Sequence, residues 1–202
     1  MVRLLTHDTV PLYRTPDNAI YHYIKEAERE GAERSLYLKT GSDFDITVLT
    51  GKSTYHIDES IIFLDRIKLQ GARKPLIKTT KRELDFEKTK WESDVKPPVY
   101  YFQERHKITL YPIPDIDYRL MIDGSRRPLE DMETPPELHE SLTHWCLYRI
   151  LSNPEADIYN GQEALVQLQK FADIFGHKRT AWFDNLHRNN SMDSSMNPNP
   201  FN

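Results

Sequence analysis

The chain has 202 residues, of which 29% are charged and 38% are hydrophobic, and its formal net charge is −4 at pH 7. This length is enough to bury a core in one domain, and the net acidity argues against a protein that coats nucleic acid. No stretch approaches the roughly 20 apolar residues that span a bilayer, and the first residues lack the apolar run of a signal peptide. We therefore expect a soluble, cytoplasmic protein.

The N-terminal region is predicted to be an arm followed by a helix. Residues 1–15 have no clear hydrophobic period. Thr15 and Pro16 then have the character of an N-cap and a first helical residue, and apolar residues recur on one face as far as Gly31. This pattern predicts an amphipathic helix of about four turns.

From residue 44 to residue 122 the hydrophobic period changes to two, which is typical of strands. The predicted strands cover residues 44–48, 55–57, 61–69, 76–77, 99–102, 108–111 and 118–122. Between them, Thr80 and Glu83 have the spacing of a capping box, in which each side chain bonds the backbone amide of the other residue. The middle of the chain is therefore predicted to be a small antiparallel sheet region.

The clearest helix start lies at Thr134, with proline at the first helical position and Glu137 at the third. The helix that it opens, to about residue 151, is apolar on most faces. Asn153 and Pro154 begin the next segment, whose apolar stripe ends at Gly176. The expected fold class is α+β: a helical bundle, made of the N-terminal helix plus two C-terminal helices, with an inserted small antiparallel β-sheet region and an extended C-terminal tail.

This reading divides the chain into four parts. Residues 1–40 are the N-terminal arm and helix of the bundle, residues 41–133 the inserted β-rich region, residues 134–180 the C-terminal helices and residues 181–202 an extended docking tail. The tail is rich in asparagine and serine, so it is expected to be disordered alone. Because Trp182, Phe183 and Phe201 are costly to leave exposed, we interpret them as anchors for a partner.

Candidate catalytic and metal-ligating residues lack the required spacing. His139 and His144 are five residues apart, whereas a zinc-protease helix needs histidines four apart on one face. Two pairs of closely spaced aspartates are typical of turns and lack a third ligand. They are Asp43 with Asp45 and Asp115 with Asp117. Cys146 lies in an apolar helix and is interpreted as a small buried residue. We therefore expect no enzymatic activity, no metal and no cofactor.

One stretch of the chain is distinctly basic. It contains Arg66, Lys68, Arg73, Lys74, Lys78, Lys81 and Arg82. Acidic residues dilute it, so the first interpretation is a solvated surface. The alternative is a patch that faces DNA or an acidic partner, because closely spaced cations favour approach to phosphate. No motif that reads DNA sequence accompanies it.

The order of the elements carries a resemblance. Residues 108–115 (ITLYPIPD) are a strand that ends in a Pro-x-Pro turn, and the alternating residues 118–122, a basic exit at 126–129 and the helix start at 134–137 follow. Further segments in the same order are residues 20–29, 44–51, 53–57, Trp91, 97–102 and the helix with His139, Glu140, Trp145, Leu147 and Tyr148. Over most of residues 16–184 the chain resembles the adaptor proteins of tailed bacteriophages, the head-to-tail connector subunits that include the tail tubular protein A of short-tailed phages.

The resemblance implies a structural virion protein. Such an adaptor forms a ring beneath the portal, expected to be a dodecamer, that connects the portal to the tail and lets DNA pass. The implied partners are the portal protein, a tail or nozzle protein, other copies of the chain and, non-specifically, the genomic DNA, with no membrane. The implied location is the virion neck, and the host cytoplasm during assembly. The tail with Trp182, Phe183 and Phe201 would dock on the portal.

Two other functions stay open. The first is a DNA-binding accessory protein of phage packaging or regulation that uses the basic stretch. The second is a hydrolase that acts on the cell wall, as some tail components do.

Overall fold

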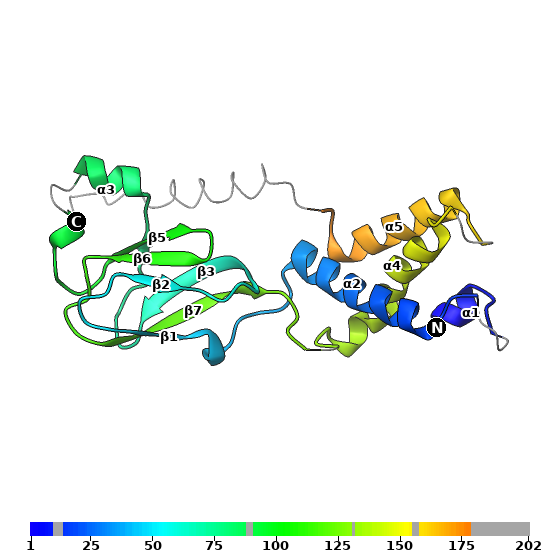
Figure 1. Ribbon diagram of the computed structural model, residues 1–202, viewed down its shortest axis with the longest axis horizontal. Coiled ribbons are helices and arrows are strands. Elements are labelled where there is room, and N and C mark those ends of the chain that lie inside the picture. The colour runs from blue at the N-terminus through cyan, green and yellow to red at the C-terminus, as the bar shows by residue number, and fades with distance from the viewer. Residues whose placement is uncertain (10–13, 88–90, 131, 155–157, 179–202) are drawn as a thin grey trace, which may run out of the picture. The chain divides into compact units, whose positions relative to one another are not determined.

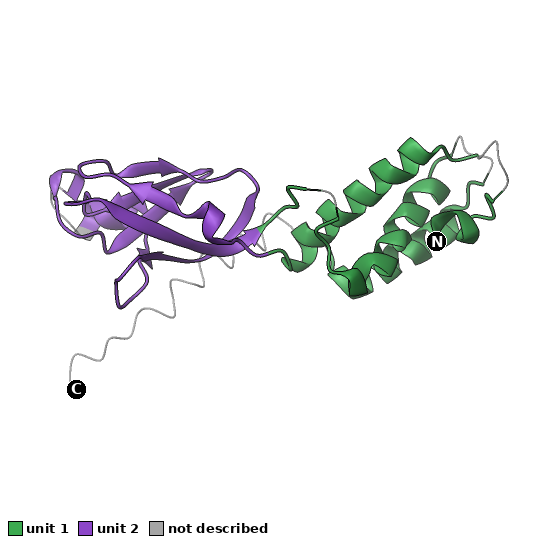
Figure 2. Ribbon diagram, turned by 90° about the horizontal axis from the view of Figure 1, so that it is seen from below, with its two compact units in different colours: residues 1–38, 126–179 green, residues 39–125, 180–202 purple. Residues whose placement is uncertain are grey.

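The computed structural model describes residues 1–9, 14–87, 91–130, 132–154 and 158–178. The chain packs as two compact units (Figure 2). The helical unit begins with residues 1–38 and continues from residue 126, and the β unit contains residues 39–125. The β unit is therefore inserted into the chain of the helical unit.

The helical unit is built around one central helix. Its elements are α1 (Val2–Leu5), α2 (Asp17–Ser35), the 3₁₀ helix η3 (Pro136–Leu138), α4 (His139–Leu151) and α5 (Gly161–Phe175) (Figure 1). α4 packs against α1, α2 and α5. The core of the helical unit consists of Ala27, Leu142, Trp145, Phe171 and Phe175, and a second cluster contains Val2, Cys146 and Ile150. The predicted N-terminal arm thus begins with the short helix α1, in which Val2 is buried.

α2 differs from its prediction at both ends. Its N-cap is Pro16, and the backbone amide of Thr15 instead donates to Asp8 at 3.0 Å. The helix passes Gly31 and ends at Ser35, and its C-cap Leu36 is left-handed, with a φ of 56°. A Cβ on Gly31 would lie 3.1 Å from the Phe175 ring. This glycine therefore allows close packing of α2 on α5 and does not end the helix.

The β unit contains two sheets. The three-stranded sheet has the order β1-β7-β3, with β1 at Ile46–Val48, β7 at Tyr118–Arg126 and β3 at Ile61–Leu69. The four-stranded sheet has the order β2-β6-β5-β4, with β2 at Thr54–His56, β6 at Lys107–Tyr111, β5 at Tyr100–Glu104 and β4 at Ile77–Lys78. β4 and β5 run parallel. Short helices η1 (Ser42–Phe44), α3 (Lys81–Glu87) and η2 (Trp91–Ser93) complete the unit.

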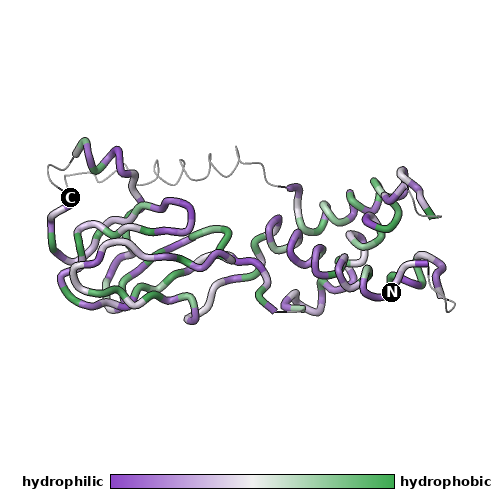
Figure 3. The backbone as a smooth tube through the Cα atoms, viewed as in Figure 1, coloured by the Kyte–Doolittle hydropathy of each residue, from purple (hydrophilic) through white to green (hydrophobic). Residues whose placement is uncertain are grey.

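Both sheets contribute to one core, because alternate residues of a strand point to the same face. Hydrophobic residues recur along the strands of both sheets (Figure 3). The largest buried residues include Ile67 and Leu120 from one sheet and Ile108 and Leu110 from the other. A smaller cluster on the opposite face of the four-stranded sheet contains Leu84, Trp91, Phe102 and Tyr111.

The prediction of a helical bundle with one small antiparallel sheet is wrong. The fold is α+β, with two sheets of three and four strands in a compact unit of their own. The two strands on either side of residues 49–53 do not pair with each other, because β1 pairs with β7 and β2 pairs with β6. The period of two identifies a strand but not its partner, so it does not distinguish one sheet from two.

The two segments that join the units are paired with each other. Lys39 and Ser125 form an isolated antiparallel bridge. The amide of Arg126 donates to the Leu38 carbonyl at 2.9 Å, and the amide of Thr40 donates to the Gly124 carbonyl at 3.0 Å. The chain therefore leaves the helical unit and returns to it through two adjacent, hydrogen-bonded segments.

Candidate partner-binding surfaces

A buried carboxylate fixes the start of α4. Glu28, on α2, is 2% exposed. It accepts hydrogen bonds from the Thr134 amide at 2.7 Å, from the Thr134 hydroxyl at 2.9 Å and from the Met132 amide at 3.2 Å. Because its proton goes to Glu28, the Thr134 hydroxyl accepts from Tyr37 at 2.6 Å.

This network overturns the predicted N-cap at Thr134. Its side chain bonds Glu28 and Tyr37, so it does not cap the helix. Pro135 precedes the 3₁₀ helix η3, and the α-helix begins at His139. The capping box at Thr80 and Glu83 is confirmed, since the Glu83 amide donates to Thr80 Oγ1 at 3.2 Å and the Thr80 amide donates to the Glu83 carboxylate at 2.8 Å.

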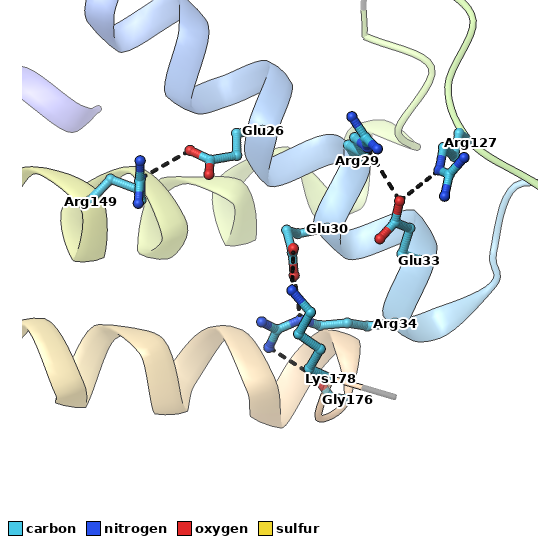
Figure 4. A network of polar contacts seen from close by, with 9 residues as sticks. All are labelled: Glu26, Arg29, Glu30, Glu33, Arg34, Arg127, Arg149, Gly176 and Lys178. Carbon is cyan, nitrogen blue, oxygen red and sulfur yellow. Dashed lines mark hydrogen bonds and ion pairs between the residues drawn. The ribbon is translucent and has the colours of Figure 1, made fainter. Parts of the chain in front are cut away.

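A second buried charge lies where α2 meets the end of α5 (Figure 4). The Arg34 side chain is 7% exposed and forms an ion pair with Glu30 at 3.1 Å. Its guanidinium lies 5.2 Å from the ring centroids of both Trp145 and Phe171. One guanidinium nitrogen donates to the Gly176 carbonyl at 3.4 Å. Arg34 thus places positive charge at the C-terminus of α5, which the helix dipole favours.

Ion pairs extend this network over the helical unit. Glu30 also binds Lys178 at 3.3 Å, which ties the residues after α5 to α2. Glu33 binds Arg29 at 3.2 Å and Arg127 at 2.6 Å, and Glu26 binds Arg149 at 3.0 Å (Figure 4). The chain is therefore fixed to α2 at Arg127, where it returns from the β unit, and at Lys178.

The sequence contains a signal for both buried charges that the prediction did not use. Glu28 lies four residues after Ile24, and Arg34 lies three residues after Gly31, so both fall within the apolar stripe of α2. A charged residue in such a stripe needs a buried partner. Those partners, at Thr134 and Gly176, are far away in the sequence.

Glu133 provides a test of the electrostatics. Its hydrogen bond to Arg126 lowers the pKa of this carboxyl from 4.5 to about 2. A lowered folded-state pKa stabilises the fold above the ordinary pKa, and this contribution disappears as the pH falls from about 4.5 towards 2. We expect Glu133→Gln to unfold at a lower temperature than the wild type at pH 6 and at nearly the same temperature at pH 2. Thermal unfolding across this range is the measurement, and a constant difference would contradict the assignment.

The basic residues of the sequence lie on several elements. Arg66 and Lys68 are on β3, Arg73 and Lys74 in the loop after it, Lys78 on β4, and Lys81 and Arg82 on α3. Arg66 forms an ion pair with Asp123 at 2.6 Å. Neighbouring pairs on the same sheet join Arg119 to Asp45 at 2.9 Å and Lys39 to Asp65 at 3.4 Å. Much of the charge on this sheet is therefore balanced. A DNA- or partner-facing role for the stretch stays a prediction, and Trp182, Phe183 and Phe201 lie outside the described residues.

The two histidines of the candidate zinc motif have different structural partners. His139 donates to the Thr134 carbonyl at 2.7 Å, and His144 bonds Gln167 at 2.7 Å, so the two rings serve different contacts. Within the described ranges no group of three His, Cys, Asp or Glu residues is arranged to hold a metal. Cys146 is buried as predicted, and burial raises the pKa of its thiol to about 12.

Three of the four aspartates in the two suspected pairs make contacts in turns and strands. Asp117 accepts from the amide and hydroxyl of Thr50 at 2.7 and 2.9 Å, and Asp115 accepts from the Tyr118 hydroxyl at 2.6 Å. Asp45 forms its ion pair with Arg119. These contacts show that Asp45, Asp115 and Asp117 stabilise loops and neighbouring strands, as aspartates in turns commonly do.

A groove of about 410 Å³ lies on the outer face of the four-stranded sheet. Its aromatic wall is made of Trp91, Phe102 and Tyr111. Charged residues of both signs also line it, namely Lys81, Lys107, Glu92 and Glu104. The Trp91 indole donates to Asp85 at 2.7 Å, so this ring is fixed by a polar contact as well as by packing.

Comparison with known proteins gives one family. The family model described as SU10 adaptor protein matches residues 1–198, and thus both units. No curated protein matches the chain. None of the helices in the described ranges is both long and apolar enough to cross a membrane.

Proposed function

The chain belongs to the SU10 adaptor protein family, and from this we propose that it forms a ring beneath the portal that connects the portal to the tail and lets DNA pass. Membership makes it a structural protein of the bacteriophage neck, in a family that is not one of enzymes. The finer likeness to tail tubular protein A stays a prediction.

The observation that supports the proposal is the extent of the family match, which includes both units. A closed ring needs two different surfaces on each subunit, because each copy meets its neighbours through unlike faces. A chain with a helical unit and a separate β unit offers such unlike surfaces. We expect a dodecamer.

We further propose that residues 181–202 anchor the adaptor to the portal through Trp182, Phe183 and Phe201. The contacts of Arg34 and Lys178 support this, because they fix the position at which the chain leaves the helical unit. A segment with spaced aromatic anchors and a fixed origin is suited to binding pockets of a neighbouring protein.

Electron microscopy of the purified chain mixed with its purified portal protein tests both proposals. We expect rings of the chain stacked on the portal. A variant that lacks residues 186–202 should keep the unfolding temperature of the isolated chain while its capture on the portal is lost. If the full-length chain forms no complex with the portal, the proposed function is wrong. If the truncated chain binds with full affinity, only the anchoring role of the deleted residues is wrong.

A further inference from the structure

One edge of the four-stranded sheet is basic. β4 is the terminal strand of this sheet, and residues 73–82, which include it, contain no aspartate or glutamate. We call this segment the basic edge. Four of its cations are exposed, and none of the four forms an ion pair within the described part of the chain. They are Arg73, Lys74, Lys81 and Arg82.

The basic edge also exposes apolar side chains. Ile77 is 45% exposed, and its amide donates at 2.8 Å to the carbonyl of Val99, which is 46% exposed. The segment is fixed to β3, because the Leu76 amide donates to the Ile67 carbonyl at 2.8 Å. DNA phosphates would use the cations of such a surface alone, whereas an apolar protein surface bordered by carboxylates would use the apolar side chains as well.

The helical unit presents a surface of the opposite charge. It consists of residues 129–140, before and at the start of α4, and we call it the acidic turn. Two of its apolar side chains are exposed, Leu129 by 59% and Met132 by 46%. Three of its carboxylates are exposed, and none of the three has an ion-pair partner among the described residues. They belong to Glu130, Glu137 and Glu140.

Hydrogen bonds hold the acidic turn in one conformation. The Glu133 carboxylate accepts from the Leu129 amide and, at 2.7 Å, from the Glu130 amide. The buried Glu28 accepts from the Met132 amide at 3.2 Å. A surface that is already ordered loses little conformational entropy on binding, which raises its affinity for a partner.

We propose that the basic edge of one copy binds the acidic turn of the next copy in the ring. This inference rests on the proposed function and names the subunit contact that the ring requires. A cyclic ring joins unlike surfaces, and each copy has one basic edge, on the β unit, and one acidic turn, on the helical unit. Each surface combines exposed apolar side chains with unpaired charge, and the two charges are opposite in sign. A second copy therefore supplies the complement of each surface.

Charge reversal on the full-length chain tests this contact. The basic-edge variant carries Arg73→Glu, Lys74→Glu and Arg82→Glu. The acidic-turn variant carries Glu130→Lys, Glu137→Lys and Glu140→Lys, and a combined variant carries all of these changes. The matched control reverses three other exposed cations of the β unit: Lys52→Glu, Arg105→Glu and Lys107→Glu. Each protein is mixed with the purified portal protein, electron microscopy and sedimentation measure the yield of rings, and thermal unfolding shows whether each variant keeps its fold.

We expect the yield of rings to fall at least about tenfold for each of the two reversed variants alone, because like charges then face each other at every contact. The control should form rings as the wild type does. The combined variant should restore the rings, because every contact again joins opposite charges. An equimolar mixture of the two reversed variants should restore them too. Copies that alternate around a ring with an even number of subunits join opposite charges at every contact.

Three outcomes overturn this inference alone. In the first, both reversed variants form rings in the wild-type yield. In the second, neither the combined variant nor the mixture restores the rings. In the third, the basic-edge variant loses binding to duplex DNA while its rings persist, which assigns the basic edge to DNA. A wild-type chain that forms no ring on the portal overturns the proposed function itself.

Discussion

Replacing Glu28 by alanine is expected to lower the free energy of unfolding of the helical unit by about 3 kcal/mol, because buried donors on Met132 and Thr134 lose their acceptor. The Glu28 side chain accepts three hydrogen bonds while almost fully buried. Chemical denaturation followed by circular dichroism measures the change.

Two further variants help to interpret the stability of Glu28→Ala. Glu28→Gln keeps the shape and one acceptor oxygen but turns an amide donor towards one of the donors, so a loss of about 1 to 2 kcal/mol is expected. Glu140→Ala is the control, because Glu140 is an exposed carboxylate on α4. It should change stability by less than about 1 kcal/mol. Equal stability of Glu28→Ala and the wild type would show that the buried network does not hold α4 to α2.

Replacing Arg34 by alanine is expected to cost about 3 kcal/mol, since this change removes a buried ion pair, a contact with the end of α5 and the filling between two aromatic rings. Arg34→Lys retains the charge but loses the planar group that lies over Trp145 and Phe171. It should therefore recover only part of the stability that Arg34→Ala loses. Denaturation with fluorescence and circular dichroism measures both variants.

The control for Arg34 is Arg29→Ala on the same helix. The Arg29 side chain is 62% exposed, and its partner Glu33 still has its ion pair with Arg127 when Arg29 is removed. The free energy of unfolding is therefore expected to fall by less than about 1 kcal/mol. If Arg34→Ala were as mild as Arg29→Ala, the contacts of Arg34 would not be what holds the end of α5 to α2.

The sequence predicts local structure here better than it predicts partners. The strand at residues 61–69, the capping box of Thr80 and the helix end at Gly176 all depend on residues close together in the chain, and each is present in the structure. The pairing of β1 with β7 and of β2 with β6 depends on packing of distant segments. Alternation specifies which face of a strand is buried, so two sheets around one core satisfy it as well as one sheet does.

The errors at helix ends have the same physical origin. Thr134 has the right residue type and spacing for an N-cap, but Glu28 offers its hydroxyl and amide a buried charged acceptor. Gly31 is a residue type that often ends a helix, but here its missing side chain leaves room for the Phe175 ring against α2. In both cases a tertiary contact outweighs a local preference of about 1 kcal/mol.

Because the two segments that join the β unit to the helical unit are hydrogen bonded to each other, the β unit can be removed or exchanged as one piece. The Leu38 carbonyl and the Arg126 amide are already hydrogen bonded at 2.9 Å, so a short turn is enough to close the helical unit without the intervening residues. The reverse also holds, since a different domain whose termini lie close together can be grafted at this point with little loop-closure entropy. Such a replacement would exchange the β unit while the helices of the helical unit keep their own packing.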